Sequence, residues 1–262
     1  AGVMLVAALL VLLGHADAQA AVGVVPPMVA GAFLALTGVL LVADLKQPGR
    51  FHYLILKGNW SSWLVKGAYV LMAFAAVCAL WWIGGLADAP GLLRVLAVPA
   101  VLGAAGTAGY TAFLFGQCEG RDLWQTPLLL PVLLAQAVTA GGAAYAIIDV
   151  FMDVPEATAI RWVLLGGVAA TAALIAIELT SSGSRTVELA VEAMTSGRYA
   201  NQFWLGGVVI GLVVPAALVI IALVVGGSAA TALAAIAGLA ALVGMFAYED
   251  SFVRAGQSVP LS

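Results

Sequence analysis

The stretch VVIGLVVPAALVIIALVV, residues 208–225, contains neither a charged nor a polar side chain. A helix formed by it would be apolar on every face, and the period-two alternation of a membrane barrel strand is absent. A helix needs about 20 mostly apolar residues to cross the roughly 30 Å hydrocarbon core of a bilayer. This stretch therefore predicts a transmembrane helix.

The rest of the chain repeats this pattern. Hydrophobic residues make up 64% of the 262 residues and charged residues only 9%, far from the composition of a soluble domain. Long apolar windows occupy about residues 25–45, 62–86, 91–116, 126–150, 158–180, 203–225 and 229–248. Residues 1–14 are apolar but short and have no basic flank, so we expect a helix that has lost its first turns rather than a signal peptide. We predict an all-α membrane protein forming a single integral membrane domain over residues 1–262, with about eight transmembrane helices of which the first is truncated.

Metal and haem sites have little support in this sequence. Cys78 and Cys118 are too few for an iron–sulfur cluster held by four thiolates or for a structural zinc site. His15 and His52 fall at helix ends that the chain count places on opposite membrane faces. We therefore expect no haem and no iron–sulfur cluster in this chain.

The basic residues are distributed unevenly between the two membrane faces. Alternating the spans places two of them, Arg94 and Arg161, on one face, called face B. The opposite face, face A, carries Lys46, Arg50, Lys57, Lys66, Arg121, Arg185, Arg198 and Arg254. Short loops rich in lysine and arginine normally stay in the cytoplasm, so we expect face A to be cytoplasmic in a bacterial-type inner membrane.

A connection on face A has the pattern of an amphipathic helix. Residues 184–197 place the apolar side chains of Val187, Val191 and Met194 at helical spacing. The segment could lie on the lipid surface or present a docking surface for a partner. Both readings stay open at the level of sequence.

Three segments of the chain resemble the NrfD/PsrC family, the integral membrane subunits of polysulfide-reductase-type respiratory complexes. DLKQPGRF at residues 44–51, followed by NWSSWLVKGAY at 59–69, is similar to the helix end DLGRPxRF and the helix start SWxxxGA of that family. GYTA at 109–112 and RDLWQTPL at 121–128 resemble its YTG and RPLWxTPL segments. GRYA at 197–200 resembles the entry to its seventh helix. The matches cover nearly the whole chain in the family's order.

Two departures from the family pattern bear on the site. Asp122 stands where the family usually has proline. The first half of helix one, which contributes polar quinone ligands in the family, has no counterpart in this sequence. His15 lies at the wrong end of helix one to replace those ligands.

The resemblance implies a quinone or quinol, menaquinone or ubiquinone, bound among the first four helices. Tyr110 matches the helix-four tyrosine of the family, and its hydroxyl could donate a hydrogen bond to a quinone oxygen. A tyrosine of the interfacial aromatic belt is the alternative. The ring oxygens need hydrogen-bond partners and proton carriers, which this chain could offer, and an electron donor or acceptor, which it lacks.

Three ionisable residues on face A are candidate proton carriers for this chemistry. Asp44 and Lys66 lie at the ends of apolar helices, where an ionisable group is costly unless it is paired or faces water. A structural pair of Asp44 with Lys66 or with Arg50 is the alternative. His52 has an unperturbed pKa near 6.5, which suits a proton relay, although a loop histidine is more often simply solvated.

Further polar and aromatic residues on face A could border the pocket mouth or contact a partner. They are Arg50, Trp60, Gln117, Glu119, Arg121, Trp124 and Arg198. For the tryptophans, anchoring at the membrane interface is the simpler interpretation.

The leading functional hypothesis is a membrane anchor and quinone-reactive subunit, redox-inert by itself. The resemblance implies that it exchanges electrons with a peripheral iron–sulfur subunit joined to a molybdopterin oxidoreductase. A secondary transporter or channel is the main alternative, but Pro131 and Pro215 interrupt the spans without a buried charge beside them. A purely structural anchor is a third possibility. Nothing in the sequence supports nucleic-acid binding.

Overall fold

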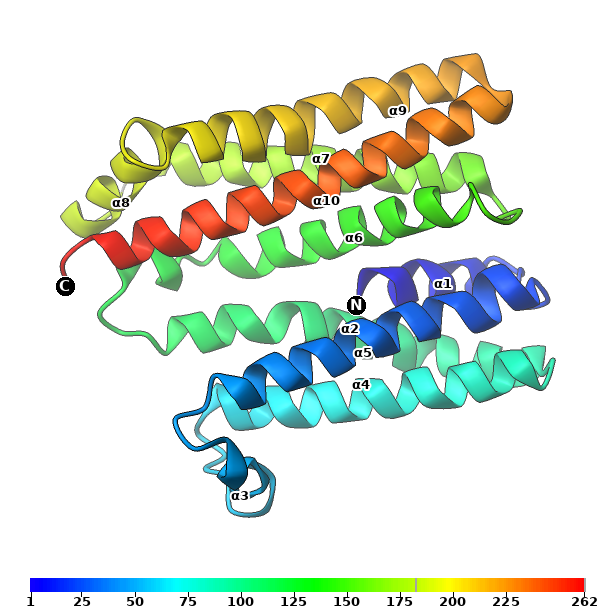
Figure 1. The fold of residues 1–262 in the computed structure, drawn as a ribbon, viewed down its shortest axis with the longest axis horizontal. Helices are drawn as coiled ribbons and strands as arrows, with labels where there is room; N and C mark the ends of the chain where they lie inside the picture. The colour runs from blue at the N-terminus through cyan, green and yellow to red at the C-terminus, as the bar shows by residue number, and fades with distance from the viewer. Residues whose placement is uncertain (182, 262) are drawn as a thin grey trace. The chain divides into compact units, whose positions relative to one another are not determined.

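The computed structural model describes residues 1–181 and 183–261, with the backbone alone described for Gln19, Arg50, Phe51, Leu54 and Ile55. Every regular element in these residues is helical, which confirms the all-α prediction (Figure 1). Seven of the described helices are long and apolar enough to cross a membrane, and an eighth apolar helix, α1 (Gly2–Leu12), is shorter. The chain is therefore a multi-pass membrane protein. The described residues group into two compact units, 1–114 and 115–262, so the prediction of a single domain stays a prediction.

The first unit contains α1 and three spanning helices. A π-helical turn, η1 (Gln19–Val24), leads directly into α2 (Val25–Ala43). The short helices η2 (Pro48–Arg50) and α3 (Phe51–Leu56) then connect α2 to α4 (Trp63–Leu86). The last helix, α5 (Pro90–Gly116), starts after a tight turn and reaches the end of the unit.

Small residues and one buried hydrogen bond bring η1 and α4 together. A Cβ on Gly23 would lie 2.9 Å from the Cα of Gly85, so neither position has room for a side chain. The buried indole of Trp81 donates a hydrogen bond of 2.9 Å to the backbone oxygen of Val22. Close backbone approach at small residues is the usual basis of helix association in lipid.

The second unit begins with the turn η3 (Asp122–Gln125) and contains four spans. They are α6 (Leu129–Ile148), α7 (Ala157–Thr180), η4 continued by α9 (Gln202–Val213 and Val214–Val225), and α10 (Gly227–Ser258). The surface helix α8 (Arg185–Thr195) falls within the range predicted for an amphipathic helix and starts at Ser184, whose hydroxyl accepts a hydrogen bond from the amide of Val187.

Helix α10 packs against α6, η4 and α9, as Figure 1 shows. A Cβ on Gly211 of η4 would lie 2.8 Å from the Cα of Gly244, and one on Gly238 would lie 2.8 Å from the backbone oxygen of Ala143 in α6. These contacts put helix backbones against one another. The glycines explain how so long a helix packs against three others.

At the face-B end of this unit, one polar cluster joins three helices. Asp149 follows the last residue of α6, and its carboxylate lies 3.8 Å from the Arg161 guanidinium in α7. Thr231 of α10 donates to the same carboxylate at 3.1 Å. The two charged side chains are only 11% and 12% exposed, so each compensates the burial of the other.

Candidate functional site

Tyr110 lies on α5, and its ring packs against the backbone of α4. A Cβ on Gly67 of α4 would lie 2.5 Å from the Cε2 atom of the Tyr110 ring, closer than atoms can approach. Glycine at position 67 therefore makes the room that the ring occupies. The GA pair in the start of α4 and the tyrosine of α5, two separate pieces of the sequence pattern, form one contact in the structure.

The Tyr110 ring borders a cavity of about 240 Å³ within the first unit, which we call the Tyr110 cavity. Four of its lining residues carry a hydroxyl group: Tyr110, Thr107 and Thr111 of α5, and Thr37 of α2. The Thr107 hydroxyl is buried with no hydrogen-bond partner among the described residues, whereas Thr37 donates to the backbone oxygen of Phe33 at 2.8 Å. The remaining lining residues are Ala1, Ala30, Phe33, Leu34 and Leu71.

This wall suits a neutral ligand with polar oxygens on an apolar ring. Each hydroxyl offers one donor and two acceptor lone pairs. A buried hydroxyl without a partner costs free energy that a ligand oxygen could recover. No charged side chain lines the cavity among the described residues, so recognition there would rest on hydrogen bonds and apolar packing.

Aromatic side chains surround the start of α4, where Lys66 lies. The Lys66 ammonium lies 4.6 Å from the centre of the Trp63 ring, and that ring stacks on Phe113 of α5 at 4.2 Å. Trp60, 61% exposed, stacks on Tyr69 at 4.7 Å. Lys66 is therefore held by a cation–π contact at the rim of the unit.

The other predicted proton carriers do not line the Tyr110 cavity. Asp44 is exposed at the C-cap of α2, and no ion pair with Lys66 forms, since Lys66 lies over Trp63 instead. His52 is exposed on α3, where its ring lies 4.4 Å from that of Tyr53. The Arg50 side chain is outside the described residues, and with it the alternative Asp44–Arg50 pair.

In the second unit, two of the predicted docking residues make internal contacts. Arg121 donates to the backbone oxygens of Gly256, Gln257 and Val259 at 3.1, 3.2 and 2.7 Å. It thereby satisfies carbonyls at the end of α10 that lack helical partners. Trp124 is only 8% exposed and packs against Gly256, and its role at the membrane interface or in docking stays a prediction.

Three predicted docking residues remain accessible on this unit. Gln117 and Glu119 are exposed in the loop after α5, where Gln125 donates to the Glu119 backbone oxygen at 2.8 Å. Arg198 is exposed, with its guanidinium 5.9 Å from the centre of the Tyr199 ring. Their side chains could contact a partner, and that role stays a prediction.

A second cavity, of about 440 Å³, lies in the second unit among η3, the end of α7 and α8. Glu178 of α7 lines it, with one carboxylate oxygen buried and without a hydrogen-bond partner among the described residues. Asp122 also lines this cavity and accepts hydrogen bonds from Ser184 and Thr186. The aspartate in place of the family's proline thus joins η3 to the start of α8.

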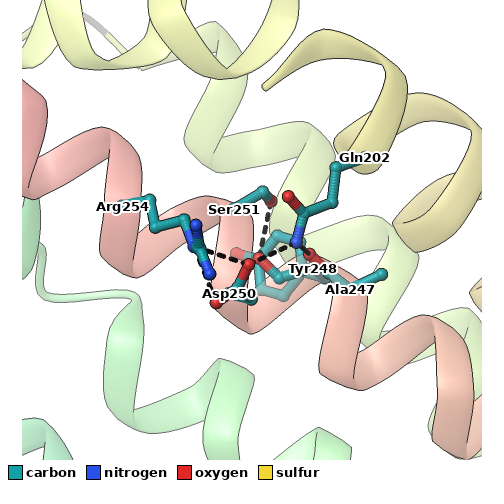
Figure 2. Close-up of polar contacts among 6 residues, drawn as sticks. All are labelled: Gln202, Ala247, Tyr248, Asp250, Ser251 and Arg254. Carbon is teal, nitrogen blue, oxygen red and sulfur yellow. Dashed lines mark hydrogen bonds and ion pairs between the residues drawn. The ribbon is translucent and has the colours of Figure 1, made fainter. Parts of the chain in front are cut away.

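Figure 2 shows a polar cluster that joins η4 to α10. Gln202 donates to the Asp250 carboxylate at 2.6 Å, and Arg254 pairs with the same carboxylate at 2.8 Å. Ser251 donates to the backbone oxygen of Tyr248 at 2.7 Å. Asp250 is held here in a local ion pair.

The sequence did not single out Thr37 and Thr107 as residues that line the cavity, or Gly67 as the residue that makes room for the Tyr110 ring. A signal for part of this set was present: Thr107, Tyr110 and Thr111 are spaced i, i+3 and i+4, which places three hydroxyls on one helix face. Thr37 lies in a different helix. Its place beside Tyr110 follows from packing that no local pattern reveals.

Comparison with known proteins identifies the family to which this chain belongs. The sequence model of the family described as Polysulphide reductase, NrfD, matches residues 1–260. The chain belongs to the NrfD family. A relative of this NrfD-family protein is the C chain of polysulfide reductase from Wolinella succinogenes. The two are 26% identical over an alignment of 259 residues, and the alignment covers 89% of this chain and 80% of the relative. The family resemblance read from the motifs is thereby confirmed.

Proposed function

We propose that this chain is the membrane anchor and quinone-reactive subunit of a respiratory oxidoreductase complex. The observation that carries the proposal is the Tyr110 cavity, a hydroxyl-lined space inside a bundle of membrane helices. Membership of the NrfD family supports the same conclusion, since the relative from Wolinella succinogenes is named as one chain of a polysulfide reductase.

The hydroxyls of the cavity match what quinone chemistry requires of a protein. Tyr110 can donate to a ring oxygen, and the unpartnered Thr107 hydroxyl can donate or accept as the ring oxygens gain or lose protons. A quinone bound here would supply two-electron redox chemistry. Asp44, Lys66 and His52 remain proposed proton carriers between the cavity region and water, although none of them lines the cavity itself.

Electrons would pass to or from a peripheral iron–sulfur subunit, which is joined to a molybdopterin catalytic subunit. Face A offers exposed candidates for this docking contact, with Trp60 on the first unit and Glu119 and Arg198 on the second. The excess of basic residues favours a cytoplasmic position for face A. This arrangement is part of the proposal.

The test is the variant Tyr110→Phe in the purified complex, which removes one hydroxyl and keeps the ring. We expect quinone turnover to fall about tenfold, the loss of one hydrogen bond of roughly 1.4 kcal/mol. Tyr145→Phe makes the same chemical change in α6, where the buried hydroxyl has no hydrogen-bond partner among the described residues, and should leave turnover unchanged.

Assembly of each variant would be checked on a native gel, and binding of a quinol-analogue inhibitor would be measured beside turnover. Unchanged turnover and unchanged inhibitor affinity in an intact Tyr110→Phe complex would reduce Tyr110 to an ordinary helix-packing tyrosine.

A further inference from the structure

The connection between α2 and α4 carries a local excess of positive charge. Residues 45–66 hold four of the ten basic residues of the chain and neither aspartate nor glutamate. The four are Lys46, Arg50, Lys57 and Lys66. Asp44, at the C-cap of α2, directly precedes this segment. The segment is therefore basic, although the whole chain has a net charge of −3.

Helix α3 within this connection has an apolar face that the rest of its unit leaves open. Its sequence is FHYLIL, in which His52 is the one strongly polar residue. Tyr53 and Leu56 are spaced i, i+3, which puts them on one face of the helix, and they are 45% and 76% exposed. Figure 1 shows α3 outside the bundle, at the ends of α2 and α4 that it connects. The face formed by these two side chains is therefore largely uncovered by the described part of the chain.

A lysine lies at the edge of this apolar face. The Lys57 ammonium is 5.5 Å from the centre of the Tyr53 ring. Lys46 and Lys57 are both exposed, and neither pairs with a carboxylate among the described residues, whereas Arg185 and Arg254 pair with carboxylates at 3.1 and 2.8 Å. Positive charge is thus available to an external anion beside exposed apolar side chains.

The covalent connections keep α3 near the membrane surface. One span ends at Ala43 and the next begins at Trp63, and the short segments 44–50 and 57–62 join α3 to them. Tryptophan at the start of a span is typical of the headgroup level. A helix with apolar side chains on one face and lysine beside them lies in this layer with the apolar face about 5–10 Å deep.

We propose that α3 and the two lysines beside it bind anionic phospholipid. Tyr53 and Leu56 lie among the upper parts of the acyl chains, and Lys46 and Lys57 bind the headgroup phosphates. The ligand class is a phospholipid of net negative charge, such as phosphatidylglycerol. Lipid is favoured over a protein partner because lipid of the surrounding leaflet already lies at this level. The proposal depends neither on the Tyr110 cavity nor on a quinone.

A label at position 56 reports which lipid lies beside α3. Leu56→Cys, in a background lacking Cys78 and Cys118, carries a nitrobenzoxadiazole fluorophore, and the purified complex is placed in phosphatidylcholine nanodiscs. A small fraction of the lipid bears a nitroxide quencher on its acyl chain and has either a phosphatidylglycerol or a phosphatidylcholine headgroup. We expect both to quench, with phosphatidylglycerol favoured about twenty-five-fold, about fivefold for each lysine. The same label at Glu188→Cys, exposed on α8, should show no such preference.

Two double variants test whether the lysines cause the preference. In Lys46→Gln with Lys57→Gln, the two headgroups should quench equally, while quenching by phosphatidylcholine stays as in the wild type. Arg185→Gln with Arg254→Gln is the matched control, since it removes two exposed charges from the same predicted face and should leave the preference unchanged. In the wild type, 1 M salt should reduce the preference because the screening length falls to about 3 Å.

Three results would overturn the proposal. Absence of quenching by either lipid would do so, whether the label is open to a water-soluble quencher or shielded by a protein partner. Equal quenching by the two headgroups in the wild type would place α3 in lipid without a site for the anionic headgroup. Equal loss of preference in both double variants would indicate a response to overall charge rather than binding at α3.

Discussion

At the scale of single residues, the candidate site depends on one pair that the sequence alone does not connect. Gly67 and Tyr110 belong to different motifs, and their resemblance to family segments identifies each separately. The structure shows that the glycine is needed because the aromatic ring lies where a Cβ would be. The contact between Gly67 and Tyr110 therefore identifies the candidate site more specifically than either motif does by itself.

This contact predicts the effect of the smallest possible substitution. In Gly67→Ala the added methyl group would overlap the Tyr110 ring, so we expect a loss of about 1–3 kcal/mol of stability and a clear fall in quinone turnover. Thermal unfolding of the detergent-solubilised complex and turnover measure the two effects. Gly166→Ala in α7, with open space around its Cβ, should lower neither, and equal behaviour of the two variants would contradict the packing role of Gly67.

Residue roles were predictable from the sequence only in part. Tyr110 could be singled out because its motif resembles the family pattern, and its role in quinone binding stays a prediction. Trp60 is 61% exposed, as a polar and aromatic loop between two helices leads one to expect. The burial of Trp124 against Gly256 could not be found, because 132 residues separate the two along the chain, as their numbers show. Long-range contacts of this kind leave no local periodicity in the sequence.

At the scale of elements, the helix ends follow hydrophobicity closely. The window predicted over 62–86 is the helix Trp63–Leu86, and the window predicted over 91–116 is the helix Pro90–Gly116. The agreement is close because a long apolar segment in lipid can form all its backbone hydrogen bonds only as a helix. The last span was predicted over 229–248 and continues to Ser258. Its final turns carry charged residues, which pair along the helix surface as Asp250 and Arg254 do.

The cluster of Asp149, Arg161 and Thr231 at the face-B end of the second unit should stabilise the packing of the three helices that it joins. Removing the guanidinium in Arg161→Met leaves the Asp149 carboxylate buried without its cation, so we expect a loss of about 3–5 kcal/mol. Arg185→Met breaks the exposed pair with Glu188, 75% and 58% exposed, and should cost about 0–1 kcal/mol.

Thermal unfolding monitored by intrinsic tryptophan fluorescence, to which all seven tryptophans contribute, would compare the two arginine variants. Similar midpoints for Arg161→Met and Arg185→Met would show that the buried cluster contributes no more than the surface pair.

At the scale of the whole molecule, the uneven distribution of basic residues predicts an orientation in the membrane. Within the second unit, η3, α8 and the end of α10 contact one another, as the alternation of spans requires for segments on the same face. The two compact units were not predictable, since composition is similar along the whole chain. The orientation itself stays a prediction from the basic residues.

Single cysteines in a background lacking the native Cys78 and Cys118 would test this orientation. In intact spheroplasts, a membrane-impermeant maleimide should react with Asp153→Cys on face B and not with Gln257→Cys on face A. After permeabilisation both should react, because both positions are exposed. Labelling of Gln257→Cys in intact spheroplasts would place face A, and its docking residues, outside the cytoplasm.

The contact between Arg121 and the end of α10 also has a consequence for biosynthesis. Its acceptor carbonyls lie 135 to 138 residues further along the chain. At a synthesis rate of about 5–20 residues per second, the guanidinium waits on the order of ten seconds for them to emerge. Four spans leave the ribosome in that interval. The Arg121 contact can therefore form only after all four spans have been synthesised, whereas Asp122 of the same turn can bind Ser184 and Thr186 of α8 earlier. The η3 turn is thus attached to the rest of the unit in two steps during membrane insertion.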